Sequence, residues 1–142
     1  MSNPSKRKGD EEERRCLAIA VGEGFNARRT RPGRMEDQGD IHIFGQFMSI
    51  PDAALQIKNV RQPRFRDWLA QLATQIKAAG AETGAIVWKH SVPGKPVERI
   101  AILPYTELLV LYRKAGYGPP PDSTCPCDGC QPLDEDVEDW AA

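Results

Sequence analysis

The sequence predicts an α/β fold in which helices flank a mixed central β-sheet. Helical and extended patterns follow one another in the order helix, three strands, helix, two strands, helix, and the second helix is strongly amphipathic. A chain of 142 residues can bury one core but is short for two. We therefore expect one domain over residues 1–117, with a basic N-terminal arm, and a tail over residues 118–142.

The first helix is expected to run from Asp10 to about Gly24. Asp10 suits the N-cap, and the three glutamates that follow it suit the first turn. Glu13 lies at the head of the apolar stripe, whereas Glu11 and Glu12 are expected to point elsewhere. The stripe consists of Cys16, Leu17, Ala20 and Val21. Glu13 therefore either faces the interior or folds back onto Asp10 as a capping box, and helical geometry favours neither.

Short strands are expected next. Their predicted ranges are 26–31, 40–44 and 54–59, with a weaker candidate at 47–50. In the third range Leu55 and Ile57 share one face, while Gln56 and Lys58 share the other. The polar pair is expected to point away from the core.

A second helix begins after Pro63 and ends at Gly80. Its apolar residues keep helical spacing and are Phe65, Trp68, Leu69, Leu72 and Ile76. Two more strands are expected at 83–89 and 97–103. A last helix, capped by Thr106, should extend through Ala115 and complete the domain.

The net charge of −1 hides an uneven distribution. Residues 118–142 hold seven acidic residues and no Lys or Arg, whereas residues 1–117 hold 19 basic and 13 acidic residues, a net charge of +6. The clustered basic residues are Lys6, Arg7, Lys8, Arg28, Arg29, Arg31, Arg34, Arg61, Arg64 and Arg66. Such clusters suit binding to the phosphates of DNA, although solvated surface charge gives the same pattern.

The apolar runs LAIAV and ELLVLY are far too short to cross a membrane, and the polar start does not resemble a signal peptide. We expect a soluble, cytoplasmic protein with no membrane partner. Cys16 stands alone, and no disulfide framework is expected in a reducing compartment.

The tail is rich in proline and acidic residues and is expected to be flexible. Three thiols, Cys125, Cys127 and Cys130, fall within six residues, a density that can bind Zn²⁺. A closed zinc site needs four ligands, however, and the paired C-x₂-C spacing occurs once. A zinc site and a metal-free tail both stay open.

Hydrolysis of a phosphodiester needs oxygen ligands for Mg²⁺, a positioned water and a cation. Asp40, Gln56 and Lys58 could supply these parts. Sixteen residues separate Asp40 from Gln56, enough for a strand, a turn and a returning strand. The end of the first strand can therefore lie beside the middle of the second.

In this order, several segments of the chain resemble the PD-(D/E)XK nuclease superfamily, and within it the archaeal and phage Holliday-junction resolvases. The resemblance covers roughly residues 5–115. It rests on KRKGDEEERR, ARRTRPGR, Gly39-Asp40-Ile41, LQIKN and TGAIVWKH. It implies a restriction-endonuclease-like core, Mg²⁺-dependent cleavage of four-way DNA junctions in recombination and repair, and a symmetric homodimer. For a phage-encoded member, the compartment would be the host cytoplasm.

The resemblance also implies roles for individual residues. Glu13 would be the helical metal-site glutamate, Asp40 the central metal ligand, and the Ile57 carbonyl a main-chain ligand. Lys58 would orient the attacking water and stabilise charge in the transition state. Gln56 stands where most members carry an acid; an amide oxygen can bind Mg²⁺, or Mn²⁺ in its place, but contributes no charge.

Two other functions remain open: a related nuclease acting on flaps or ends, and a DNA-binding module of the same fold without activity. Glu36 and Asp37 could assist the site or be merely solvated. Gln71 and Gln75 could reach it from the second helix or form a polar face. The remaining candidates, His42 and His90, have no metal-ligand spacing, and His90 could contact DNA.

Overall fold

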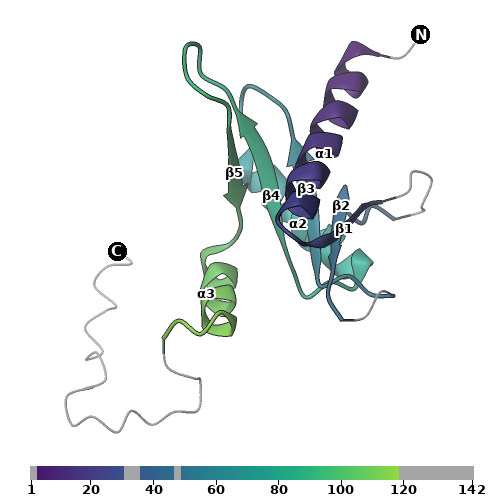
Figure 1. Cartoon of the computed structure of the whole chain (residues 1–142), viewed down its shortest axis with the longest axis vertical. Helices are drawn as coiled ribbons and strands as arrows, with labels where there is room; N and C mark the ends of the chain where they lie inside the picture. The colour runs from purple at the N-terminus through teal and green to yellow at the C-terminus, as the bar shows by residue number, and fades with distance from the viewer. Residues whose placement is uncertain (1–2, 31–35, 47–48, 119–142) are drawn as a thin grey trace, which may run out of the picture. The chain divides into compact units, whose positions relative to one another are not determined.

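The computed structural model describes residues 3–30, 36–46 and 49–118. The chain divides into two compact units, Met1–Tyr105 and Thr106–Ala142. The first unit holds a five-stranded sheet and the helices α1 (Pro4–Gly22) and α2 (Phe65–Ala79) (Figure 1). The described part of the second unit is the helix α3 (Tyr105–Lys114) and the turn that follows it. None of these helices is both long and apolar enough to span a bilayer.

The sheet is mixed. Its strands lie in sequence order: β1 (Asn26–Arg29), β2 (Ile41–Phe44), β3 (Ala53–Lys58), β4 (Thr83–His90) and β5 (Glu98–Ile102). β3 and β4 are parallel and joined through α2, and every other neighbouring pair is antiparallel. The expected α/β fold is therefore confirmed. Of the weak candidate strand at 47–50, Ser49 and Ile50 form a bend, and residues 47–48 lie outside the described residues.

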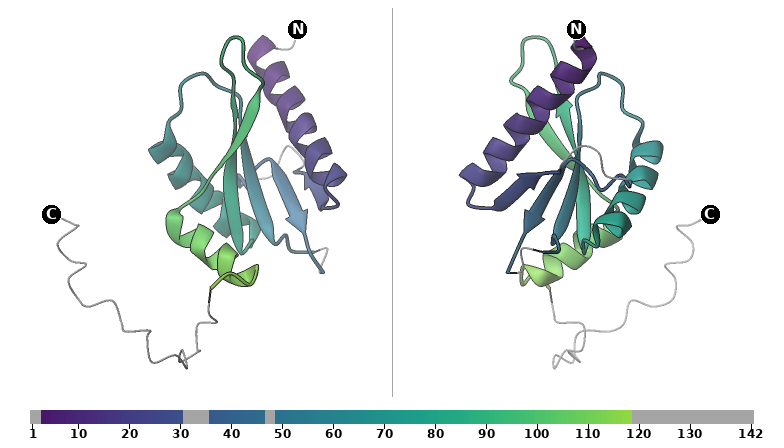
Figure 2. Two further views of the ribbon diagram at one scale, coloured as in Figure 1. Left: turned by 60° about the vertical axis from the view of Figure 1, so that its left-hand side comes forward. Right: turned by 90° about the vertical axis from the view of Figure 1, so that its right-hand side faces the viewer.

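Helices cover both faces of the sheet (Figure 2). On one face Cys16 of α1 packs with Ile41 and Ile57. On the other face Trp68 and Leu72 of α2 pack with Ile86 and with other apolar residues of β4 and β5. Because the central strands are buried on both sides, the expectation that Gln56 and Lys58 point away from the core is wrong. Both side chains contact α2.

The first helix begins six residues earlier than the sequence suggested. Asn3 caps it, its side chain accepting a hydrogen bond from the Ser5 N–H at 3.1 Å, and Pro4 occupies the first helical position. Asp10 is thus inside α1 and is not a cap, and the basic residues 6–8 are helical. The capping-box alternative for Glu13 is also wrong, because Asp10 and Glu13 both accept hydrogen bonds from Arg29.

The second helix packs closely against the parallel strands. Gly80 ends it in the left-handed conformation, as expected, with φ of 68°. A Cβ atom at Gly84 of β4 would lie 2.3 Å from the Ala54 carbonyl oxygen and 2.9 Å from Ile76 Cγ1. A glycine at this position lets α2 approach the sheet and brings its polar residues over the end of β3.

Candidate functional site

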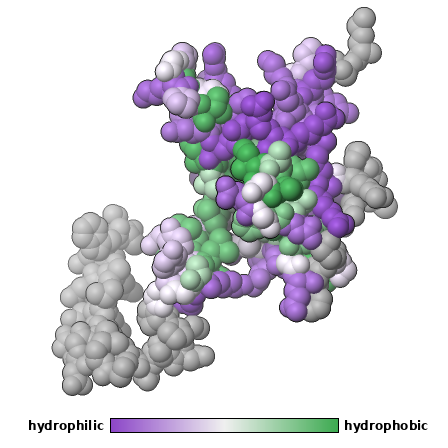
Figure 3. Space-filling model, viewed as in Figure 1, coloured by the Kyte–Doolittle hydropathy of each residue, from purple (hydrophilic) through white to green (hydrophobic). Residues whose placement is uncertain are grey.

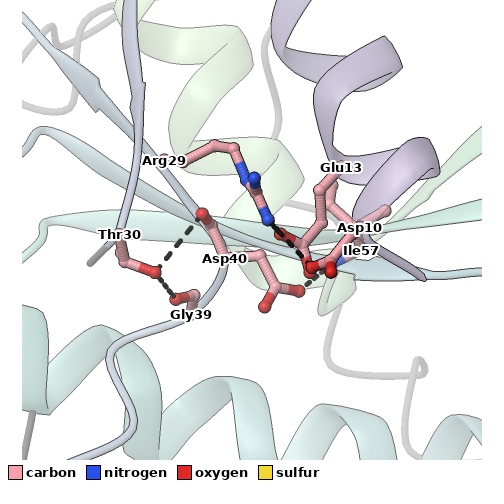
Figure 4. Close-up of polar contacts among 7 residues, drawn as sticks. All are labelled: Asp10, Glu13, Arg29, Thr30, Gly39, Asp40 and Ile57. Atoms are coloured by element: carbon pink, nitrogen blue, oxygen red, sulfur yellow. Dashed lines mark hydrogen bonds and ion pairs between the residues drawn. The ribbon is translucent and has the colours of Figure 1, made fainter. Parts of the chain in front are cut away.

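The site lies where β3 extends beyond the first residue of its antiparallel neighbour β2. Ile41 pairs with Leu55, so residues 56–58 of β3 continue past the beginning of β2. The Asp40 carboxylate takes this position beside the strand and accepts the Ile57 N–H at 2.8 Å through Oδ2 (Figure 4). A side chain thus supplies an acceptor that a neighbouring strand would otherwise provide.

Backbone contacts fix Asp40 in place. Gly39 has φ of +87°, and a Cβ there would lie 3.1 Å from the Leu55 carbonyl oxygen. Without a side chain, Gly39 lets the chain turn against β3, so that Asp40 N–H donates to Leu55 O at 2.8 Å. Thr30 secures the other side, its hydroxyl donating to Gly39 O at 2.6 Å.

The electrostatic environment shows which charged groups surround Asp40. Burial raises the pKa of its carboxyl from 3.8 to about 6, and the hydrogen bond from Ile57 opposes this rise. The charges of Glu13 and Asp37 also raise the pKa, whereas the charge of Lys58 lowers it. Glu13 lies on α1 and Lys58 contacts α2 on the other face of the sheet, and both are close enough for their charges to act on Asp40.

Glu13 is ion-paired in this structure. Arg29 of β1 contacts Glu13 Oε2 through both Nε and Nη2, and its Nη2 also lies 3.1 Å from Asp10 Oδ1 (Figure 4). The hydrogen bond from Arg29 to Glu13 raises the pKa of the guanidinium, which stays charged. Arg29 was expected to contact DNA phosphates; here it holds two carboxylates of α1 beside the sheet.

Lys58 and Gln56 are held from α2. Lys58 Nζ donates to Gln71 Oε1 at 3.4 Å and lies 5.7 Å from the centre of the Trp68 ring. Gln56 Oε1 accepts a hydrogen bond from Gln75 Nε2. Both glutamines of α2 therefore reach the end of β3, one of the two possibilities that the sequence allowed.

Glu12 is the carboxylate that the sequence interpretation missed. It was expected to point away from the core, but it is 2% exposed. Arg99 Nε of β5 donates to its Oε1 at 2.7 Å, and Lys89 Nζ of β4 lies 3.6 Å from its Oε2. Glu12 also contacts Cys16, whose pKa is raised to about 11 by burial and by the Glu12 charge. Glu12 is four residues before Cys16, so the apolar stripe itself could have placed it inside.

The donors near Asp40 have the chemistry that Mg²⁺ or Mn²⁺ requires. Glu13 and Asp40 supply carboxylate oxygens, Gln56 an amide oxygen and Ile57 a main-chain carbonyl, all hard ligands. In the described residues, no three His, Cys, Asp or Glu side chains are grouped closely enough to form a metal cluster by themselves. A metal here would therefore depend on amide and carbonyl oxygens as well as on carboxylates.

A basic surface begins next to Lys58. Two pockets, of about 360 and 490 Å³, lie side by side and share Asn59 and Lys89 as lining residues. The basic surface is defined by the cationic and histidine residues that line them, which are Lys8, Arg15, Arg61, Lys89, His90 and Lys95. Glu11 and Glu12 also line the smaller pocket. On the face shown in Figure 3 the N-terminal half of α1 is hydrophilic, whereas the β4–β5 hairpin is mixed. Val92 and Val97 are exposed there beside the polar residues.

The other predicted DNA-binding residues are distributed more widely. Those that are exposed are Lys6, Arg7, Arg28, Arg64 and Arg66. Arg31 and Arg34, and the possible zinc ligands Cys125, Cys127 and Cys130, lie outside the described residues. Three residues of the basic surface were not predicted: Arg15, Lys89 and Lys95. Arg15 follows a run of three glutamates and Arg14, and Lys89 and Lys95 lie outside the basic clusters in the sequence.

The two histidines differ in environment. His42 is 7% exposed, and its Nε2 lies 2.7 Å from the Gln38 carbonyl oxygen, so it is a structural residue. His90 packs against Trp88, with ring centres 5.0 Å apart, and lines the larger pocket of the basic surface.

The chain was compared with family models, with curated proteins and with solved structures. No protein-family model and no curated protein matches the sequence. In structure the chain is similar to Hjc, a Holliday junction resolvase from the archaeal hyperthermophile Archaeoglobus fulgidus. The two are 24% identical, the match covers 66% of this chain and 72% of that chain, and the TM-score is 0.45.

Proposed function

We propose that this chain is a metal-dependent endonuclease that cleaves phosphodiester bonds in branched DNA, with four-way junctions as its substrate. The observation that carries the proposal is the position of Asp40, whose partly buried carboxylate accepts the Ile57 N–H beside the end of β3 and feels the charges of Glu13 and Lys58. An acidic centre with an adjacent lysine suits the hydrolysis of a phosphodiester.

The metal would be held by Asp40, Glu13, the Gln56 amide oxygen and the Ile57 carbonyl. When bound, Mg²⁺ or Mn²⁺ would supply a Lewis acid and lower the pKa of the attacking water. Asp40 is suited to the central position because Ile57 engages one carboxylate oxygen and thereby orients the other. Glu13 is presented by an α1 helix that the Arg29 ion pair and the buried Glu12 hold against the sheet.

Lys58 would position the water and offset the charge that develops on the phosphate. Its Gln71 and Trp68 contacts steady the side chain without neutralising it, since Gln71 is uncharged and the aromatic ring favours a cation. Its charge is close enough to lower the pKa of Asp40. Lys58 is therefore a cation near the acidic centre, held by α2.

The basic surface would bind the phosphate backbone leading to this centre. It begins at Asn59, the residue after Lys58, and continues along the β4–β5 hairpin. Phosphate contacts select DNA by shape and charge, which suits a branched substrate of any sequence. Cutting two opposed strands of a junction requires two such centres, so we expect a homodimer.

The test is a cleavage assay on four-way junctions, flaps and linear duplex, each with Mg²⁺, Mn²⁺ or EDTA. We expect metal-dependent cleavage of the junction that Asp40→Asn and Lys58→Ala each reduce at least about a hundredfold. The control is Arg113→Ala, an exposed basic residue in the last turn of α3. A preference for flaps or ends would identify the related repair nuclease instead.

One observation favours a non-catalytic alternative. Gln56 carries no charge, and the Gln75 amide already engages its side-chain oxygen. A DNA-binding module that has lost chemistry would bind junctions tightly and cleave nothing in either metal. That result would overturn the nuclease proposal.

A further inference from the structure

Gln75 connects Gln56 to a carboxylate that the family resemblance does not include. Its Nε2 donates to Asp37 Oδ2 at 2.8 Å and also to Gln56 Oε1. Asp37 and Gln56 therefore present oxygen atoms to the same point, separated by no more than the sum of those two contacts. The Gln75 NH₂ group, the positive end of its amide dipole, lies between the Asp37 and Gln56 oxygens. Two oxygens placed in this way favour a positively charged group between them.

The other atom of the same amide has no partner. Gln75 is 2% exposed, and its Oε1 is buried without a hydrogen-bond donor among the residues that the structure describes. A buried acceptor without a partner is costly. A half-turn of the amide would exchange the nitrogen and the oxygen, so that three oxygens would face one another. Only a cation makes that arrangement favourable.

Asp37 is held in place beside the site. Its Oδ1 accepts the Gly39 N–H at 3.1 Å, in the turn that leads to Asp40. Asp37 also lines a surface pocket of about 430 Å³ together with Thr74 and Lys77 of α2. Its charge reaches Asp40, whose pKa it raises.

We propose that Asp37 supplies the carboxylate that the Gln56 position lacks, and that Gln75 turns its amide oxygen toward the same divalent cation. This inference rests on the proposed function and identifies an additional part of its metal site. The formal charge lost at residue 56 is then restored by a residue three positions before Asp40.

The inference is tested by Mn²⁺ binding to the full chain without DNA, measured by isothermal titration calorimetry. Asp37→Asn should weaken Mn²⁺ binding about tenfold or more. Glu36→Gln is the matched control, because Glu36 is the adjacent exposed acid and takes no part in the hydrogen bonds that join Asp37, Gln75 and Gln56. Equal affinity of Asp37→Asn and the native chain, or equal weakening by Glu36→Gln, would overturn the inference.

A charge-exchange variant gives a second measurement. Adding Gln56→Glu to Asp37→Asn should restore Mn²⁺ affinity to within about threefold of the native chain, because it returns one carboxylate to the site. Continued weak binding by the double variant, with its thermal transition unchanged, would count against the exchange.

The role of Gln75 has its own variant. Gln75→Met keeps the length of the side chain and removes the amide, and it should weaken Mn²⁺ binding several-fold. Unchanged binding would exclude Gln75 as a ligand.

Failure of this inference is distinct from failure of the proposed function. If Asp40→Asn abolishes Mn²⁺ binding and junction cleavage while Asp37→Asn changes neither, the nuclease stands and Asp37 is excluded. If the native chain binds no Mn²⁺, both proposals are overturned.

Discussion

Asp40 combines a structural hydrogen bond with an unfavourable charge. Its Oδ2 accepts the Ile57 N–H, while burial and the neighbouring acids Glu13 and Asp37 raise its pKa to about 6. The folded protein therefore binds a proton between pH 4 and 6 that the unfolded chain, with a pKa of 3.8, does not. Asp40 therefore contributes stability that is fully present below pH 4 and is lost as the pH rises through 6.

The variant Asp40→Asn should be more stable than the native chain at pH 8. Asparagine keeps an acceptor for Ile57 and removes the buried charge, so the free energy of unfolding should rise by about 1–2 kcal/mol without metal. At pH 4.5, where the native carboxyl is protonated, the difference should nearly vanish. Urea denaturation at both pH values measures it. A variant less stable than the native chain at pH 8 would contradict this account.

At the scale of residues, the sequence predicted which residues lie near one another better than how their side chains point. Asp40 and Lys58 were predicted to lie close together from their spacing, which reflects how a strand and its returning neighbour pair. The choice between Glu12 and Glu13 failed because each lies one turn before an apolar residue of the stripe, and both face the sheet. Each pairs with an arginine that lies far away in sequence, Glu13 with Arg29 and Glu12 with Arg99. The link from Asp37 to Gln75 spans 38 residues and has no local signal.

At the level of elements, the ion pairs of the buried Glu12 hold α1 against β4 and β5. The variant Glu12→Gln should lower the free energy of unfolding by about 2 kcal/mol, because Arg99 and Lys89 lose the carboxylate that pairs with them. Glu11→Gln is the matched control on the same helix, since Glu11 is exposed. Equal stabilities of the two variants in urea would show that the buried ion pairs add nothing.

Two glycine substitutions should have opposite effects. Gly84→Ala should destabilise by about 1–3 kcal/mol, because its Cβ would meet the backbone of β3 and the Ile76 side chain. Gly9→Ala should stabilise by about 0.5–1 kcal/mol, because Gly9 lies inside α1 with no atom within 4 Å of the added Cβ. Thermal unfolding of both variants tests this; a shift in the same direction for both would contradict it.

The strongest elements were predictable. The spacing of apolar residues and a terminal glycine gave the extent of α2, and the strand ranges agree with those observed to within about two residues. The start of α1 was missed because acidic residues at positions 10–13 resemble a first turn, whereas the cap is Asn3 with Pro4 behind it. Local capping signals compete along a helix, and packing decides between them.

For the whole molecule, the charge of the sequence divides into a basic part and an acidic tail, and the structure shows where some of the basic residues gather. Arg61 and Lys95 approach the larger pocket from different segments of the chain. Replacing each with alanine should weaken junction binding and reduce the slope of log Kd against log salt concentration by about one for each phosphate that is no longer bound.

Fluorescence anisotropy at several salt concentrations measures this slope, with Lys77→Ala as the control for loss of a positive charge elsewhere. An equal change in slope for Lys77→Ala would show that net charge, and not the basic surface, governs binding.

The end of β3 that extends beyond β2 determines how Asp40 should be substituted. Ile57 depends on a carboxylate oxygen to complete its main-chain hydrogen bonding, so the aspartate that we propose as the central metal ligand also completes the edge of a strand. The variant Asp40→Ala would leave the Ile57 N–H without its acceptor, so a loss of activity could reflect either the missing carboxylate or a disturbed strand. The variant Asp40→Asn keeps an acceptor for the Ile57 N–H and removes the charge, and it therefore separates the two effects.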